Sequence, residues 1–304
     1  MLGVMLPLSG NSRERMGGFL ARAKAAGFDF VELRMDAGEF LIIDGRPLFD
    51  ASDARAQLDE HGLRCSVHSC WGVNLADDAC RPAWEKCIGG TLEVARALNA
   101  LRVVVHPGFV LPALSLDEQR RAFAAEREAI ARIAERAATL DLIVVLENLN
   151  PTPEVVSGRW ICPCVDPREV VALITSIGSR HLRMVFDVGH YCLAVTNGHA
   201  AEFVADDAKG LVAHVHLHDN FGRVAAHEPR YEEAVQVGIG DLHMPLGFGE
   251  VPKLIEHGRV PAIADATVEY ELMDERYWRD LPSLRATAAE AVARWRSLPS
   301  AKTE

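Results

Sequence analysis

The sequence predicts a closed barrel of eight parallel β-strands alternating with α-helices, a (β/α)8 barrel, as the fold class. Two observations support this prediction. Short apolar runs, of the kind that form strands buried on both faces, alternate with longer amphipathic stretches along the 304 residues. The first run is followed by LPLSGNSRE, without the GxGxxG phosphate-binding turn that is typical of the rival open, doubly wound sheet.

Eight apolar runs are expected to form the strands, and amphipathic helices fit between most of them. The expected strands cover residues 3–8, 28–34, 63–69, 101–108, 142–148, 182–190, 211–219 and 266–271. The clearest helix is expected at residues 117–140, where Phe123, Ile130 and Ile133 fall on one stripe and charged residues face the other way. Residues 82–98 and 281–297 show a similar amphipathic pattern and are also expected to form helices.

No repeat, low-complexity tract or linker divides the chain, so we expect residues 1–304 to form one domain. Within it, residues 219–250 are long, glycine-rich and only weakly periodic, which predicts an active-site loop. Residues 298–304 are expected to be a flexible tail.

Composition limits the partners and the compartment. The net charge is −11, from 32 basic and 43 acidic residues, which argues against a broad nucleic-acid-binding face. Seven cysteines without a CxxC pair predict no disulfide framework and a cytoplasmic location. The apolar runs are shorter than the ~18 residues of a membrane span, and we see no secretory signal. With no GxGxxG turn, no nucleotide cofactor is expected.

Six of the eight expected strands end in a residue that can bind a metal ion. Because strand ends of a barrel converge on one mouth, we expect these side chains to lie together. Clustered, desolvated carboxylates need a partner, and a divalent cation is an effective one. A mixture of imidazole and carboxylate suits zinc first, with manganese or iron as alternatives. The six are His68, His106, Glu147, Asp187, His216 and Glu269.

Two further pairs add donors to this set. His190 follows Asp187 by three residues, and Asp241 and His243 lie in the stretch GDLHMPLGFGEV. A proline- and glycine-containing loop would hold Asp241 and His243 at fixed geometry over the mouth, which limits the entropy lost on metal binding.

Two choices stay open within this set. Glu269 and Glu271 share one strand face, so either could be the ligand, and Glu269 is preferred by position. His214 and His218 share a face with His216, and we expect them to pack or to support the ligands.

Five motifs together resemble the xylose isomerase-like TIM-barrel superfamily, which includes sugar isomerases and epimerases and the endonuclease IV group (AP endonuclease family 2). The resemblance extends over residues 28–271. The motifs are HPG at 106–108, EN at 147–148, DxGH at 187–190, HLHDN at 216–220 and DxHxPxGxGE at 241–250.

The endonuclease IV branch implies three zinc ions. By this resemblance, one ion would be held by His68, His106 and Glu147, and another by His190, Asp241 and His243. A further ion would be held by Glu147, Asp187, His216 and Glu269. The isomerase and epimerase branch implies a single metal on these last four residues, with Glu147 and Glu269 acting as acid and base.

Other positions point to the substrate. Glu32 and Arg34 resemble the end of the second strand in the branch that binds small sugars, whereas the loop that follows is acidic and apolar and does not suit DNA. Trp71 is expected to contact substrate or to form an apolar wall, and Arg223 could bind a phosphate or carboxylate.

Phosphoester hydrolysis at a multinuclear site is ranked first, because it accounts for all nine predicted ligands. The alternative is metal-dependent isomerisation or epimerisation of a sugar or sugar phosphate. Cleavage of DNA at abasic sites is ranked below both, and a barrel that binds without catalysis is ranked last. The expected partner is a small molecule, not nucleic acid or a membrane.

Overall fold

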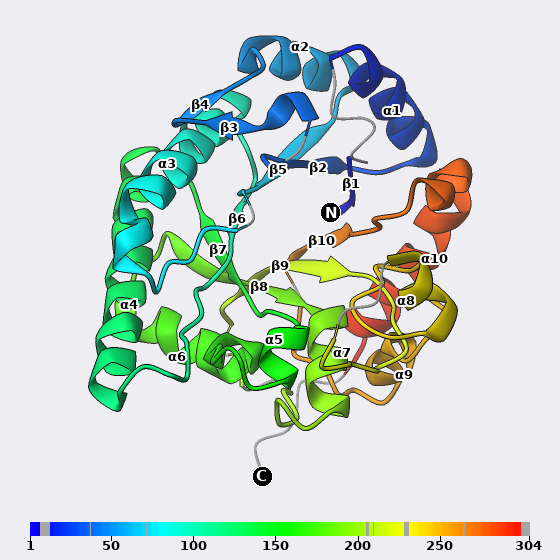
Figure 1. The fold of residues 1–304 in the computed structure, drawn as a ribbon. Helices are drawn as coiled ribbons and strands as arrows, with labels where there is room; N and C mark the ends of the chain where they lie inside the picture. The colour runs from blue at the N-terminus through cyan, green and yellow to red at the C-terminus, as the bar shows by residue number, and fades with distance from the viewer. Residues whose placement is uncertain are drawn as a thin grey trace.

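A closed barrel of eight parallel strands forms the centre of the computed structural model, and helices surround it (Figure 1). The structure describes residues 1–6, 13–36, 38–70, 72–204, 207–208, 210–227, 231–263 and 265–298. The strands are β1 (Leu2–Met5), β2 (Phe30–Arg34), β5 (Arg64–His68), β6 (Val103–Val105), β7 (Val144–Glu147), β8 (Leu182–Asp187), β9 (Val212–Leu217) and β10 (Thr267–Tyr270). Seven of the eight strands fall within apolar runs named from the sequence, and β1 begins one residue before its run, so the predicted fold class is confirmed.

Neighbouring strands follow one another around the barrel, and β1 closes it by pairing with both β2 and β10. Asp187 on β8 pairs with His216 on β9, which in turn pairs with Glu269 on β10. Most strand residues are fully buried, because barrel side chains point outward to the helices and inward to the interior. A change of register by one residue would exchange these two faces.

The helices begin and end at recognisable signals. Ser115 caps one helix with a capping box that includes Glu118, and Gly62 and Gly178 end two others in the left-handed conformation. The longer helices are α1 (Arg13–Ala26), α2 (Ala51–His61), α3 (Arg81–Leu98), α4 (Leu116–Thr139), α6 (Pro167–Ile177), α7 (Val188–Thr196) and α10 (Leu281–Arg296). The predicted helices at 82–98, 117–140 and 281–297 match α3, α4 and α10 within one residue at each end.

Short elements occupy several connections. They are the two-stranded sheet of β3 (Ile42–Ile43) and β4 (Arg46–Pro47), and the helices α5 (Pro153–Val156), α8 (Tyr231–Val237) and α9 (Val251–Glu256). Helix α8 lies inside the stretch 219–250, for which the sequence predicts a functional loop or an elaboration of the barrel. Of the predicted tail 298–304, only Leu298 is among the described residues.

Cysteine pairing differs from the prediction. The structure pairs Cys70 with Cys87 as a disulfide, with their Cα atoms 6.7 Å apart. The two cysteines lie 17 positions apart in the sequence, so no short motif indicates the pair. Within the described part of the chain, no helix is both long enough and apolar enough to cross a membrane.

Candidate metal centre

Strand ends bring the predicted ligands to one mouth of the barrel. His68, Glu147 and Asp187 are the last residues of β5, β7 and β8, and all three are buried. Histidine and carboxylate side chains form four groups, three of which share residues, and the ligand atoms within each group lie within 4.8 Å of one another. The groups are His68–His106–Glu147; Glu32–His68–His216; Glu147–Asp187–His216–Glu271; and His190–His218–Asp241–His243.

Glu147 lies at the junction of the first and third groups. Its Oε2 lies 3.0 Å from Nε2 of His106 and 3.6 Å from Nε2 of His68. Its Oε1 lies 3.1 Å from Nδ1 of His216. The two oxygens therefore face different ligand sets, which is the arrangement of a carboxylate able to bridge two cations.

Carboxylates from three residues surround Nδ1 of His216. Besides Glu147, this nitrogen lies 3.2 Å from Oε2 of Glu271 and 3.8 Å from Oδ2 of Asp187. His216 lies on β9 and Glu271 directly follows the neighbouring strand β10, and both side chains are buried. Three acids thus converge on one ring nitrogen in a region of low dielectric.

The ionisation of this group follows from its crowding. Burial acts to raise the pKa of Glu147, but the charge of His216 and hydrogen bonds from histidines outweigh it and hold that pKa well below its usual range. Burial acts to lower the pKa of His216, and the charges of Glu271 and Glu147 outweigh it and raise that pKa well above the ordinary value. Without a cation, a protonated imidazole therefore balances the carboxylates; metal binding would displace that proton.

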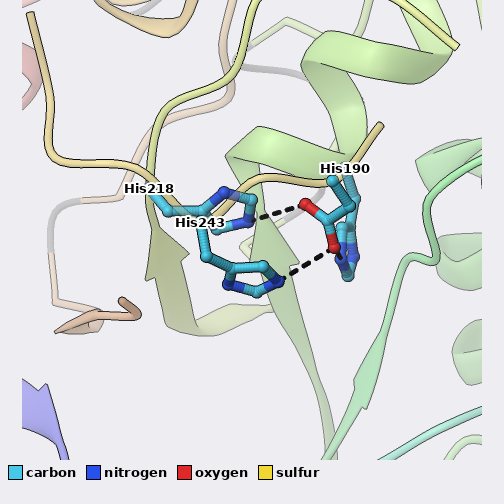
Figure 2. Close-up of side chains that lie close together, drawn as sticks. His190, His218 and His243 are labelled. Atoms are coloured by element: carbon cyan, nitrogen blue, oxygen red, sulfur yellow. Dashed lines mark hydrogen bonds and ion pairs between the residues drawn. The ribbon is translucent and has the colours of Figure 1, made fainter. Parts of the chain in front are cut away.

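The fourth group is built around the Asp241 carboxylate. Oδ2 of Asp241 lies 3.0 Å from Nε2 of His190 and 2.9 Å from Nε2 of His243. Nε2 of His218 lies 3.7 Å from Oδ1 of Asp241, and its ring stacks on that of His243 at 4.0 Å. Figure 2 shows the three labelled histidines from separate segments turned toward this carboxylate.

Asp219 fixes the loop that carries Asp241 and His243. It is fully buried, and it pairs with Met244 through two backbone hydrogen bonds. Five backbone N–H groups also donate to its carboxylate, those of Asn220, Gly247, Phe248, Gly249 and Val251. A Cβ atom on Gly249 would lie 2.0 Å from the carbonyl oxygen of Asn220, so only glycine allows this approach.

His243 itself has a left-handed backbone, with φ of 45°. This conformation is uncommon outside glycine and costs about 1 kcal/mol or more. The anchored loop sustains it, and the result is that the imidazole faces Asp241, two residues earlier, across a 2.9 Å contact.

Asn148 aligns the ends of β7 and β8. Its side chain donates to the Asp187 carbonyl and accepts from the Asp187 N–H, both at 2.9 Å. Its own carbonyl lies 2.9 Å from Nδ1 of His190. Nδ1 therefore carries the proton, and Nε2 of His190 is directed at Asp241 as a potential ligand.

The last strand departs from the preferred prediction. Glu271, not Glu269, joins Glu147, Asp187 and His216 in the candidate ligand group. Both glutamates face the interior, but Glu269 lies deeper, and neither of its carboxylate oxygens has a hydrogen-bond partner within the described part of the protein. Burial, with the charges of Glu32 and Glu271, raises the pKa of Glu269 well above its ordinary value. Because Glu271 belongs to the candidate ligand group, we now prefer Glu271 as the ligand.

The four predicted substrate contacts lie in different surroundings. Glu32 is fully buried beneath the mouth, as Glu147 is, and its contact with substrate stays a prediction. Arg34 is partly buried and forms an ion pair of 2.7 Å with Asp36. Arg223 is exposed in the long loop, and Trp71 lies outside the described residues.

Two contributors were not recognised as such from the sequence. His218 was assigned to packing or support, yet it belongs to the fourth group. Glu126 lies on the buried stripe of α4 and accepts the Gly108 N–H at 2.6 Å, which steadies the HPG turn after His106. A buried carboxylate on an otherwise apolar helix stripe was the available signal.

A cavity of about 110 Å³ adjoins Asp241. Segments from three regions line it: the turn after β7, helix α7 and the long loop. Its polar lining residues are Asn150, Thr152, His227 and Asp241. The cavity therefore offers hydrogen-bonding groups next to the fourth ligand group.

The donor chemistry fits divalent metal ions. Nitrogen and oxygen donors with no thiolate suit zinc, manganese or iron. Oε2 of Glu271, Oδ1 of Asp241 and Nδ1 of His243 are buried without a hydrogen-bond partner among the described residues. Buried polar atoms left in this state are costly, and a cation would satisfy them.

Comparison with known proteins identifies similar sequences and folds. Residues 20–259 match the family model described as a xylose isomerase-like TIM barrel. The uncharacterized protein MJ1311 of Methanocaldococcus jannaschii is 32% identical over 191 residues, which are 61% of this chain and 59% of that protein. The match thus extends over less than two thirds of the relative.

Solved structures with the same fold include two sugar epimerase-type proteins. A D-tagatose 3-epimerase-like protein superposes with a TM-score of 0.69 at 22% identity, covering 96% of this chain and 97% of its own. The D-allulose 3-epimerase of a Methylomonas species, in complex with D-allulose, gives a TM-score of 0.63 at 17% identity, covering 96% of each chain. At sequence identities this low, the superpositions establish that the folds are alike and no more.

Proposed function

Since the chain belongs to the xylose isomerase-like TIM-barrel family, we propose that it is a metal-dependent isomerase or epimerase acting on a small sugar. The observation that carries this proposal is the pair of carboxylates on Glu147 and Glu271. Both approach Nδ1 of His216, at 3.1 Å and 3.2 Å, from different strands at the mouth of the barrel. The epimerase-type proteins among the structural neighbours support the same choice. Hydrolysis, ranked first from the sequence, now takes second place.

The group suited to hold the metal is Glu147, Asp187, His216 and Glu271. A divalent ion bound there would draw electron density from adjacent carbonyl and hydroxyl oxygens of a sugar and so acidify the C–H bond beside the carbonyl. Asp187 caps the first turn of α7 by accepting the His190 N–H at 2.7 Å, which holds its carboxylate in place.

Glu147 and Glu271 are the proposed acid and base. Burial acts to raise the pKa of Glu271, but the charges of His216 and His243 lower it well below the ordinary value, so this carboxylate is ionised in the metal-free protein. For epimerisation, one carboxylate removes the proton from one face of the carbon and the other returns a proton to the opposite face. Burial and the charges of Glu32 and Glu271 raise the pKa of Glu269, and Glu271 is the glutamate grouped with Asp187 and His216, so we assign the acid–base role to Glu271.

Deuterium exchange tests this proposal directly. Protein loaded with manganese is incubated in D2O with D-allulose, D-tagatose or D-fructose, and NMR follows exchange of the proton next to the carbonyl and formation of the epimer. We expect exchange that falls at least ~100-fold in Glu147→Gln and in Glu271→Gln, because each removes a proton-transfer group. The matched control, Glu269→Gln, should retain most activity. Loss of exchange in Glu269→Gln with full activity in Glu271→Gln would reverse the assignment.

Phosphoester hydrolysis is the second candidate. It is favoured by the position of Glu147 between two ligand groups and by the separate group around Asp241. These groups account for more donors than one metal uses. Metal analysis of protein purified without chelators, together with hydrolysis of bis(p-nitrophenyl) phosphate, separates the two candidates. One bound ion per chain and no hydrolysis supports epimerisation, whereas three ions with hydrolysis and no exchange supports the second candidate.

A further inference from the structure

Glu32 is a buried acid that the proposed reaction does not use. It lies on β2, beneath the mouth, and its side chain is fully buried. The Ser66 hydroxyl donates to its Oε2 at 2.7 Å, and Nε2 of His214 lies 3.1 Å from the same oxygen. An ionised carboxylate at this depth needs such donors, since burial alone would make it costly. The contacts therefore indicate a fixed carboxylate with a defined orientation.

The second oxygen of Glu32 faces His216. Oε1 of Glu32 lies 3.3 Å from Nε2 of His216. Both atoms are buried, and neither has a hydrogen-bond partner among the residues that the structure describes. The contact is an ion-pair distance, and a proton on Nε2 of His216 would give Oε1 of Glu32 a donor.

His214 supports this orientation from the other side. Its Nδ1 lies 2.6 Å from the Thr267 hydroxyl, which is shorter than the 3.3 Å between that hydroxyl and the Ala213 carbonyl. If the hydroxyl donates to Nδ1, then Nε2 of His214 carries the proton and donates to Glu32. Glu32 thus collects donors from three neighbouring side chains: Ser66, His214 and His216.

The consequence concerns the other nitrogen of His216. A neutral imidazole has one N–H and one lone pair. With the proton on Nε2, the lone pair is on Nδ1, which faces Glu147 and Glu271 in the candidate metal group. Second carboxylates that hold a ligand histidine in this way strengthen metal binding about 10–100-fold in other proteins.

We propose that Glu32 is a positioning residue that holds His216 as the Nε2–H tautomer and directs its Nδ1 to the metal. The inference rests on the proposed metal site. It is an alternative to the predicted contact between Glu32 and substrate. Glu32 also belongs to a candidate ligand group with His68 and His216, so direct coordination by Glu32 is the competing role.

Nitrogen-15 NMR of histidine-labelled protein tests the tautomer without any mutation. In the zinc-loaded protein we expect the His216 signals, assigned by comparison with His216→Ala, to show a proton on Nε2 and a metal-shifted Nδ1. A proton on Nδ1 with zinc on Nε2 would overturn the proposal and indicate that Glu32 coordinates the metal. This readout does not depend on catalysis.

Metal affinity of the stripped protein is the second test, measured by competition with a chromophoric chelator. Glu32→Ala and Glu32→Gln should bind zinc about 10–100-fold more weakly, because His216 loses its orienting partner. The matched control is Ser66→Ala, which removes one donor to Glu32 but keeps the contact with His216, and its affinity should change less than about threefold. Thermal unfolding checks that each variant is folded.

The outcomes separate the two proposals. If His216→Ala abolishes zinc binding and Glu32→Ala binds normally, the role of Glu32 is wrong and the metal site stands. If the unmodified protein binds no divalent metal, both proposals fail. Weaker zinc binding by Glu32→Ala, together with the Nε2–H tautomer of His216 in the zinc-loaded unmodified protein, supports both proposals.

Discussion

At the scale of single residues, glycine determines how closely the ligands approach. Gly189 lies between Asp187 and His190 in α7, and a Cβ atom there would lie 2.0 Å from Cε1 of His218. The His218 ring occupies that space and contacts Asp187, with Nε2 3.1 Å from Oδ1. The glycine of the DxGH motif therefore makes room for a histidine from the next strand.

Gly189→Ala is expected to displace the His218 ring. The displacement should lower the free energy of unfolding by about 1–3 kcal/mol, the usual cost of overpacking, and should weaken metal binding at the group around Asp241. Urea denaturation and a zinc titration measure the two effects. The matched control is Gly89→Ala in α3, where a Cβ atom meets nothing within 4 Å, and this variant should be equally or more stable than the unmodified protein. Equal changes in the free energy of unfolding and in zinc affinity for Gly189→Ala and Gly89→Ala would contradict the steric argument.

Asp219 is the residue on which the long loop depends. Asp219→Ala would leave five backbone N–H groups without their acceptor, so we expect a loss of at least about 3 kcal/mol in the free energy of unfolding. Metal affinity should fall as well, because Asp241 and His243 lose their fixed positions. Asp280→Ala, which removes a helix cap that accepts one N–H at 3.1 Å, should cost only about 1 kcal/mol and leave metal binding unchanged. Normal metal binding in Asp219→Ala would show that the loop is held by other contacts.

At the scale of elements, the strands could be predicted from the sequence because burial on both faces leaves continuous apolar runs. The ligand-bearing strand ends followed from the same pattern, since parallel strands share one mouth. The choice between Glu269 and Glu271 could not be made from the sequence, because side chains two residues apart on a strand both point into the barrel. Their depth depends on how neighbouring strands are staggered, which only the closed barrel fixes. The burial of Glu32 and the position of His218 escaped prediction for the same reason.

Helix α4 gives an example of a buried acid with a structural task. Burial raises the pKa of Glu126, although the Gly108 N–H partly opposes this shift. Because the folded-state pKa lies above the unfolded value, the contribution of Glu126 to stability is full at low pH. It is lost as the pH rises through the folded-state pKa. The ionised Glu126 carboxylate is less favourable inside the folded protein than in the unfolded chain, where water solvates it.

Glu126→Gln is therefore expected to stabilise the protein at pH 8, because the amide oxygen can still accept from Gly108 and no charge is buried. The advantage over the unmodified protein should shrink toward pH 5. Glu126→Ala, by comparison, leaves the Gly108 N–H without an acceptor and should cost about 1–3 kcal/mol. Chemical denaturation at the two pH values measures both. A Gln variant less stable than the unmodified protein at pH 8 would contradict the burial argument.

At the scale of the whole molecule, the barrel concentrates acids and imidazoles that come from strands distant in the sequence. In the absence of metal these groups neutralise one another, as the contacts of His216 with Glu147 and Glu271 and of His243 with Asp241 show. A cation must therefore replace protons already bound to the histidines. Metal binding and stability are thus linked to pH through the same groups.

The pH dependence of metal stabilisation follows from this exchange. Burial acts to lower the pKa of His243, but the charges of Asp241 and Glu271 raise it to about 9. In metal-free protein, the protonated ring stabilises the fold fully below the unfolded-state pKa of about 6.5, and this stabilisation is lost as the pH rises through about 9. Metal-loaded protein lacks that proton, so the difference in stability between loaded and stripped protein should grow between pH 6.5 and 9. At a free metal concentration of ~100 times Kd, the difference should reach about 2.7 kcal/mol.

Thermal unfolding with zinc or with EDTA at several pH values measures this difference in stability, and in His243→Ala its growth with pH should be weaker. A difference that is constant or falls over this range would show that metal does not compete with protons at these histidines.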